Sequence, residues 1–230
     1  MQNAPLAGTV QLIVTDAITF YVRHFTQIAT LCLPFLILTA TLQYVLARAY
    51  PENYAALVMH FIVDLFTYPI YTAVLIRLMS RRAQQEDPGN MELIMAALPQ
   101  WGSLLMLRVF KAILIVMGLS MFILPGIWIM VRLCFAEFYL VLFNMRPREA
   151  LEKSTLATAG HFWLILAVLA VTYAPILMLL LLINQHVLAS ASIGVIKIAI
   201  ISGAYLLELF LTVALFRTFM EITIERQREA

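Results

Sequence analysis

The sequence predicts an all-α membrane protein with six transmembrane helices in three hairpins and short amphipathic interfacial helices on the cytoplasmic side. Of its 230 residues, 63% are hydrophobic and only 12% are charged, and the mean hydropathy is +0.93. An average soluble domain is about half apolar and about a quarter charged. This composition therefore excludes a soluble globular domain. It also excludes a disordered chain, because disordered chains are poor in large apolar residues.

Six segments reach the roughly 20 mostly apolar residues that a helix needs to cross the hydrocarbon core of a bilayer. Together with their short links they form a single polytopic domain over residues 1–230. The predicted spans cover residues 26–46, 54–76, 103–124, 127–143, 162–183 and 192–216.

The third and fourth spans are separated by only a short helix-breaking sequence. Read as one piece, residues 103–143 would form a helix about twice as long as a bilayer is thick. We therefore expect Pro125 and Gly126 to form the turn of a helical hairpin. The two spans are then antiparallel neighbours.

Three amphipathic segments precede predicted spans, at residues 6–24, 90–98 and 147–160. Each leads to an aromatic residue that opens the next span, and the dipeptide His-Phe occurs twice, at 24–25 and 161–162. This pattern favours three repeated units, each an interfacial helix followed by a hairpin. The alternative is that interfacial segments are in general amphipathic and end in aromatic residues.

Basic residues gather on one side of the predicted spans, which sets the orientation of the chain. On the other side Arg48 stands alone in the links, so both termini are predicted to be cytoplasmic. Three of the basic residues, Arg146, Arg148 and Lys153, are candidates for contact with anionic lipid headgroups. The residues that define the cytoplasmic side are Arg23, Arg77, Arg81, Arg82, Arg108, Lys111, Arg146, Arg148, Lys153, Arg217, Arg226 and Arg228.

The segment 124–164 carries the most distinctive pattern in the chain. Its framework is Pro125-Gly126-Ile127, Arg132, Ala150-Leu151, Ser154, Thr158, Gly160 and Phe162-Trp163. This pattern resembles the YciC-like family of uncharacterised bacterial inner-membrane proteins, and it is similar to the membrane-integral domain of some glycerophosphodiester phosphodiesterases. Glu137 departs from the apolar or proline-bearing stretch of that pattern. The resemblance implies a six-span protein of the bacterial inner membrane. It implies no activity, since the family is of unknown function and no phosphodiesterase domain is attached.

Five ionisable residues lie well inside the predicted spans, where each costs about 2.5–3.5 kcal/mol on insertion scales. Counted at about 1.5 Å per residue from the external ends, they fall into layers. Arg132 and Lys197 are predicted to lie nearest the external side, and Asp64 and Glu137 near the middle of the membrane. Glu208 is predicted to lie near the cytoplasm, beside Arg108 and Lys111. His60, Asp64 and Tyr68 share one stripe of their helix at i, i+4 and i+8. Trp128 and Arg132, four residues apart, are spaced for a cation–π contact, and Arg132 and Glu137 must find different partners because they point apart.

Two hypotheses account for this intramembrane polar network of Asp64, Arg132, Glu137, Lys197, Glu208 and His60. In the first, the residues form interhelical ion pairs that fix the packing of a bundle. In the second, Asp64, Glu137, Arg132 and Lys197 line a polar path, with His60 and Asp64 as a proton-binding pair.

No catalytic, cofactor-binding or metal-binding motif occurs in the sequence, and we expect no enzymatic activity and no cofactor. A net charge of +2 does not indicate a nucleic-acid partner. The partners expected are membrane lipids and either a protein partner or further copies of the chain. The function that fits is a non-enzymatic role in envelope or membrane homeostasis. The alternatives are a small transporter or channel component, and an accessory scaffold subunit whose small residues, such as Gly118, Gly194 and 202–204, allow close helix approach.

Overall fold

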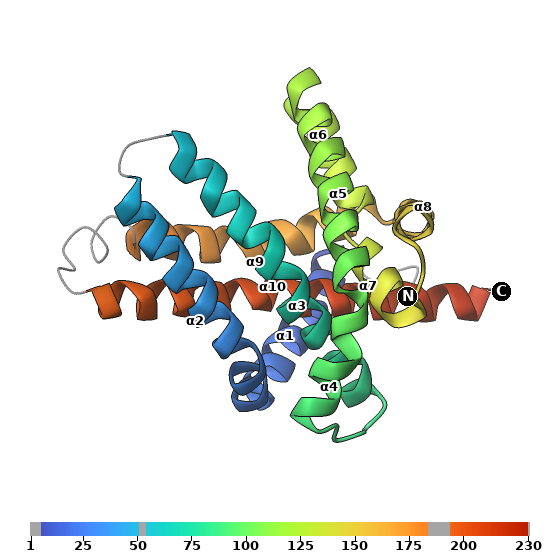
Figure 1. The fold of residues 1–230 in the computed structure, drawn as a ribbon. Coiled ribbons are helices and arrows are strands. Elements are labelled where there is room, and N and C mark those ends of the chain that lie inside the picture. The colour runs from blue at the N-terminus through green and yellow to red at the C-terminus, as the bar shows by residue number, and fades with distance from the viewer. Residues whose placement is uncertain (1–5, 51–53, 184–193, 230) are drawn as a thin grey trace.

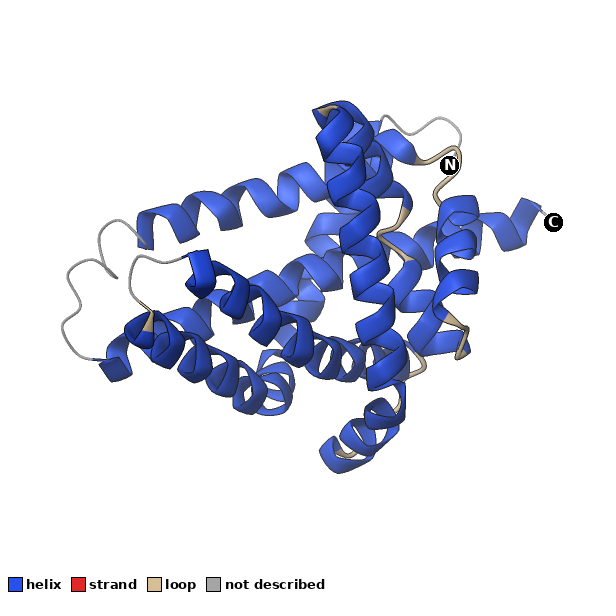
Figure 2. Cartoon of the chain, turned by 45° about the horizontal axis from the view of Figure 1, so that its top comes forward, coloured by secondary structure: helices blue, strands red, loops and turns tan. Residues whose placement is uncertain are grey.

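Helices are the only regular secondary structure in the computed structural model, which describes residues 6–50, 54–183 and 194–229. Within these ranges no strand occurs, as Figure 2 shows, so the predicted all-α class is confirmed. Residues 184–191, which connect the fifth and sixth predicted spans, lie outside the described residues. The elements are α1 (Leu6–Arg23), α2 (Phe25–Ala49), α3 (Tyr54–Ala83), α4 (Asn90–Ala97), the 3-10 turn η1 (Leu98–Gln100), α5 (Trp101–Met121), α6 (Ile123–Arg132), α7 (Ala136–Phe143), α8 (Pro147–Ala157), α9 (Phe162–Leu182) and α10 (Gly194–Glu229).

Six stretches of the described chain are long and apolar enough to cross a membrane, in agreement with the six predicted spans. Two of them combine neighbouring elements, since α4, η1 and α5 form the third and α6 and α7 form the fourth. These features identify a multi-pass membrane protein. The six stretches are Phe25–Ala49, Val58–Ala83, Asn90–Met121, Ile123–Phe143, Phe162–Leu182 and Gly194–Ile224.

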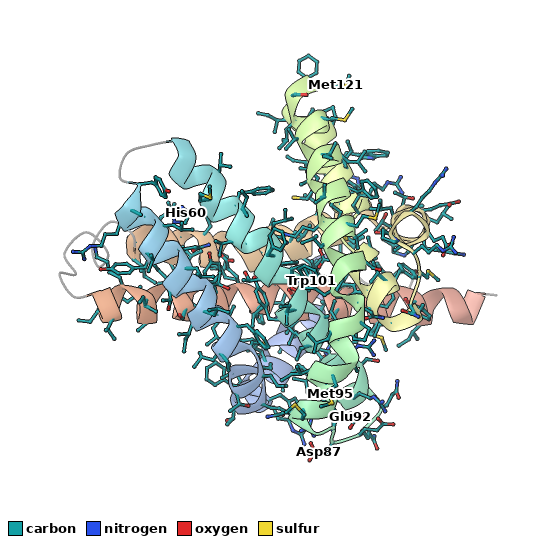
Figure 3. All side chains as sticks on the ribbon, viewed as in Figure 1. His60, Asp87, Glu92, Met95, Trp101 and Met121 are labelled. Carbon is teal, nitrogen blue, oxygen red and sulfur yellow. The ribbon has the colours of Figure 1, made fainter. Side chains whose placement is uncertain are left out.

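The spanning helices do not all run in one direction. In Figure 1, α5 and α6 stand across the direction of α9 and α10, while α2 packs along both α3 and α10. The start of α5 is fixed to α3, where the Trp101 indole Nε1 donates a hydrogen bond to the Phe66 carbonyl oxygen at 2.9 Å. The far end of α5, at Met121 in Figure 3, projects from the rest of the molecule. The arrangement in three hairpins stays a prediction.

The core lies where α3, α7 and α10 meet. There Phe135 and Phe138, which flank the start of α7, are almost fully buried and contact Phe219 of α10 with ring centroids 5.4 Å apart in both pairs. The second half of α3, including Leu75 and Met79, is buried beside them. This aromatic and aliphatic core surrounds the base of the α5–α6 projection.

The turn between α5 and α6 falls three residues earlier than the sequence indicates. Phe122 is the single extended residue (φ −162°, ψ 161°) between Met121, which ends α5, and Ile123, which begins α6. The prediction that Pro125 and Gly126 form the turn is therefore wrong. Both residues lie in the first turn of α6, where proline is tolerated because the missing N–H would have no helical partner.

Gly126 instead has a packing role together with Gly118 of α5. A Cβ atom on Gly118 would lie 3.0 Å from the Gly126 Cα, and a Cβ on Gly126 would lie 3.0 Å from the Leu119 backbone nitrogen. The two glycines are four residues on either side of Phe122, so α5 and α6 run antiparallel with their backbones in close contact.

The predicted fourth span is interrupted rather than continuous. After Arg132 the chain makes a turn at residues 133–135 before α7 begins. The Ser154 hydroxyl of α8 fills this break: it donates to the Arg132 carbonyl oxygen at 2.7 Å and accepts from the Phe135 N–H at 3.1 Å. A break within a membrane span is tolerated where a neighbouring side chain satisfies the freed backbone groups.

Helices occur at all three predicted amphipathic segments, as α1, α4 and α8. Two of the three junctions to the following helix have the same backbone geometry. His24 (φ −106°, ψ 12°) precedes α2 and His161 (φ −110°, ψ 18°) precedes α9, and their carbonyls accept 3.0 Å hydrogen bonds from Ile28 and Ile165. The repeated His-Phe dipeptide thus marks the same structural position twice. The third junction differs, because α4 continues through η1 into α5.

Candidate functional site: a buried charge cluster

Five polar side chains from α3, α5 and α7 form one connected cluster inside the bundle. The Arg108 guanidinium Nη2 lies 2.6 Å from Asp64 Oδ2, and the Lys111 ammonium Nζ lies 2.7 Å from Glu137 Oε1. The Tyr68 hydroxyl donates to Glu137 Oε2 at 3.0 Å. We call Asp64, Tyr68, Arg108, Lys111 and Glu137 the charge cluster.

Tyr68 joins the two ion pairs. Its hydroxyl is bound by Glu137, and its ring lies under the Arg108 guanidinium, whose Cζ is 3.4 Å from the ring centroid. Arg108 therefore contacts a carboxylate and an aromatic face at once, and such cation–π contacts strengthen as water is removed. The cluster is a chain of contacts that runs from Asp64 to Lys111.

Helical spacing explains how the cluster assembles. Asp64 and Tyr68 are four residues apart on α3, and Arg108 and Lys111 are three apart on α5, so each pair lies on one face of its helix. Glu137 lies in the first turn of α7, immediately after the break at 133–135. The start of α7 brings this carboxylate to Lys111, and the predicted stripe of Asp64 and Tyr68 faces α5.

The cluster carries two cations and two carboxylates, so its formal charges cancel. Glu137 is buried, with 8% of its surface exposed, and each of its oxygens has a partner. A buried charge is costly unless it is both paired and hydrogen-bonded. Both conditions are met here, which makes the cluster well suited to join three helices.

Arg132 lies apart from the charge cluster. Its guanidinium Nη1 donates to the Thr155 carbonyl oxygen of α8 at 3.0 Å, and its Cζ lies 4.9 Å from the centroid of the Trp128 ring. The predicted cation–π contact is confirmed, as is the prediction that Arg132 and Glu137 have different partners. The common depth of Arg132 and Lys197 in the membrane stays a prediction.

Lys197 and His60 lie at the far end of α2, α3 and α10, where both line a cavity of about 380 Å³. Glu208 lines a different cavity, of about 160 Å³, together with Tyr205 and apolar residues of α9 and α10. Arg108 and Lys111 make their ion pairs with Asp64 and Glu137 and not with Glu208. The charge of Glu208 nevertheless interacts with those of Arg108 and Asp64, so the predicted proximity of Glu208 to Arg108 is confirmed in part. The structure therefore does not bring the six predicted network residues together.

Sequence reasoning missed the two cations that complete the cluster. Their positions in the sequence predict that Arg108 and Lys111 belong to the cytoplasmic positive charge and lie beside Glu208, whereas their i, i+3 spacing places them on one face of an apolar span. That spacing, opposite the Asp64 and Tyr68 stripe, was the available signal. The contribution of Glu137 depends on the helix break, for which the sequence offers no comparable signal.

The predicted lipid-contact residues lie on and beside α8. Arg146, Arg148 and Lys153 are exposed, while Ala150, Ser154 and Ala157 of the same helix are buried against the bundle. The basic side chains are therefore available to a membrane surface. Their contact with headgroups stays a prediction.

Within the described ranges, no group of three or more His, Cys, Asp or Glu side chains is placed to hold a metal ion, and Cys32 and Cys134 are free thiols. The chain matches no protein-family model, no curated protein and no solved structure. The fold and the charge cluster together define a polytopic α-helical membrane protein whose spans are joined by two ion pairs, one largely buried and one half-buried.

Proposed function

We propose that the chain is a non-enzymatic protein of the bacterial inner membrane, with a role in envelope or membrane homeostasis exercised through contacts with lipids and other proteins. In this proposal the charge cluster holds the helices together and conducts nothing. The observation that carries it is that both carboxylates of the cluster are occupied by cations of a single helix, α5. A path for ions or solutes needs groups that exchange partners with water along its length.

A reconstitution experiment separates this proposal from the transporter alternative. Purified protein in proteoliposomes is tested for proton and solute flux as wild type, Asp64→Asn and Glu137→Gln. If the charge cluster only holds the helices together, we expect no flux for any of the three proteins and a lower folding yield for both variants. Flux in the wild type that either substitution abolishes would establish the transporter reading instead. Glu221→Gln is the matched control, because it neutralises a carboxylate of the last candidate span that lies outside the cluster.

The proposed orientation, with both termini in the cytoplasm, is tested separately. It rests on the excess of Lys and Arg on one side of the spans. Reporter fusions at the two termini and in the segment between α2 and α3 should give cytoplasmic signals at the termini and a periplasmic signal in that segment. A periplasmic terminus would overturn the orientation.

An accessory scaffold role is favoured by one surface of α10. Gly118 and Gly194 each have a close neighbour within the chain, but a Cβ on Gly203 would meet no atom within 4 Å. Gly203 thus leaves room for another helix to approach. A pull-down in mild detergent that recovers a stoichiometric partner from wild type and not from Gly203→Leu would support this role. Equal recovery by both would exclude Gly203 as the contact.

A further inference from the structure

A basic cavity lies at the end of the bundle remote from the charge cluster, where α2 ends and α10 begins. Its volume is about 380 Å³. Figure 3 shows one of its residues, His60, on α3 close to α2. The described residues that line it are Gln43, Tyr44, Ala47, Arg48, His60, Lys197 and Ile201, and we call this cavity the basic pocket.

The polar groups of the basic pocket are predominantly donors. Arg48 Nη1 contacts the Tyr44 hydroxyl oxygen at 3.3 Å, which leaves its other N–H groups for a ligand. The Gln43 side-chain oxygen accepts from the Tyr205 hydroxyl at 2.8 Å, so the remaining polar atom of this buried amide is its donor nitrogen. Lys197 adds an ammonium group with three donors. Such a set favours an acceptor-rich, negatively charged ligand.

The charge of the basic pocket is not balanced by its own lining. Arg48 and Lys197 are cationic, and none of the described lining residues is a carboxylate. Lys197 lies only about 4–5 Å along the axis from Gly194, where α10 begins, and this positive end of the helix dipole disfavours a cation. Elsewhere in the spans, Arg108 and Lys111 have carboxylate partners within 3 Å. We propose that the basic pocket binds an anionic phosphate group.

The surroundings of the pocket favour a phospholipid as the source of this phosphate. All three helices are at the ends of their spans here, where the headgroups of a bilayer lie. Exposed apolar side chains adjoin the lining residues, among them Val45 of α2, Val58 of α3 and Val195 of α10, the last with 74% of its surface exposed. A lipid would place its phosphate in the pocket and its acyl chains along these side chains.

The proposal goes beyond the function proposed above and does not depend on it, since a scaffold or a transporter can equally hold a lipid. Its test uses the purified full chain in detergent, titrated separately with phosphatidylglycerol, phosphatidylcholine and inorganic phosphate. Thermal unfolding and native mass spectrometry follow each titration. The variant is Arg48→Gln/Lys197→Gln. The control is Arg23→Gln/Arg81→Gln, which removes the same charge from two exposed positions outside the basic pocket.

We expect phosphatidylglycerol to raise the melting temperature saturably and to be retained in the mass spectrum, for wild type and control alike. The pocket variant should need an about tenfold or higher lipid concentration for half-saturation, a difference of about 1.4 kcal/mol. Without lipid it should unfold at or above the wild-type temperature, because a repulsion between cations has been removed. Saturable stabilisation by inorganic phosphate alone, lost in the pocket variant, would support the site and identify free phosphate as the ligand.

Three results would overturn the proposal. The first is equal retention of phosphatidylglycerol and phosphatidylcholine. The second is an equal loss in the pocket variant and in the Arg23→Gln/Arg81→Gln control. The third is no saturable effect of any titrant. If the double variant does not fold, the single substitutions Arg48→Gln and Lys197→Gln are compared by the number of lipids retained. That number is read from the folded fraction and is therefore separate from yield.

Discussion

Lys111 of α5 and Glu137 of α7 form the most buried ion pair among the described residues, with 2.7 Å between the ammonium nitrogen and a carboxylate oxygen. The second oxygen of Glu137 accepts from Tyr68 of α3. One carboxylate of α7 thereby contacts two other helices, α3 and α5. Because Arg108 adds the Asp64 contact on the same face of α5, the base of the α5–α6 projection is fixed at two points.

Removing the cation of this pair should destabilise the fold more than removing both of its charges. Lys111→Met leaves Glu137 charged and buried, and breaking a buried pair in this way costs about 3–5 kcal/mol. Lys111→Met/Glu137→Gln removes both charges and keeps a hydrogen-bonding group for Tyr68, so its loss should be smaller. Thermal unfolding in detergent measures the difference. A double variant no more stable than the single one would show that the ion pair does not fix the helices.

The Ser154 hydroxyl should be the least replaceable group at the break between α6 and α7. It bonds the Arg132 carbonyl and the Phe135 N–H, so Ser154→Ala leaves two backbone groups without this partner. The expected loss is about 1–3 kcal/mol, because the Phe135 N–H loses this acceptor and the Arg132 carbonyl keeps only the longer contact from the Thr158 hydroxyl at 3.5 Å.

Thr155→Ala is the matched control for Ser154→Ala. The Thr155 hydroxyl bonds only locally, to the Glu152 carbonyl oxygen at 2.7 Å, and the residue still supplies its own carbonyl to Arg132. Chemical or thermal unfolding of the two variants should therefore differ clearly. Equal stability of the two variants would mean that water replaces the Ser154 hydroxyl at the break.

The sequence predicts the helices well and their side-chain partners poorly, for a physical reason. Hydropathy and length define each span locally, as with the 21 residues of α9, and need no knowledge of neighbours. Partners depend on depth, and depth counted along a straight helix fails where α6 gives way to α7. A depth for Glu137 counted from Gly126 runs through that break. Long cationic side chains such as Lys111 also extend by about one helical turn along the helix axis. The charged group can therefore lie at a different depth from the Cα atom of its residue.

Position within a helix explains the remaining error. Pro125 and Gly126 favour a turn by residue type, but proline is also common in the first turn of a helix. Phe122, the residue at the actual reversal, is apolar and has 76% of its surface exposed. Nothing in its chemistry distinguishes it from its neighbours, so residue type alone predicts the turn three residues too late.

A methyl group at Gly118 should separate α5 from α6. The Cβ of Gly118→Ala would lie 2.7 Å from the Ile129 side chain and 3.0 Å from the Gly126 backbone, closer than packed atoms tolerate. Overpacking of this kind typically costs about 1–3 kcal/mol. Gly102→Ala, in the same helix, meets no atom within 4 Å and should be neutral or stabilise by up to about 1 kcal/mol through helix propensity. Thermal unfolding of the two variants compares them directly, and equal melting temperatures would contradict the close contact of the two backbones.

The junction between α1 and α2 should make stability depend on pH. Partial burial lowers the pKa of His24 below its ordinary value of 6.5, and the nearby cations Arg82, Arg23 and Arg217 lower it further, against the opposite effect of Asp87. The folded state therefore binds fewer protons than the unfolded state in this range. The contribution of His24 to stability is fully present above pH 6.5 and is lost as the pH falls from 6.5 through the lowered pKa.

We expect the melting temperature of the wild type to fall as the pH is lowered from 7.5 to 5.5, because a protonated His24 is repelled by these arginines. His24→Gln, which cannot gain this charge, should show a smaller fall over the same interval. The measurement is thermal unfolding at constant ionic strength, since salt screens charges at an exposed junction. Parallel curves for the wild type and His24→Gln would assign the pH dependence to other groups and leave His24 with only its backbone role at the start of α2.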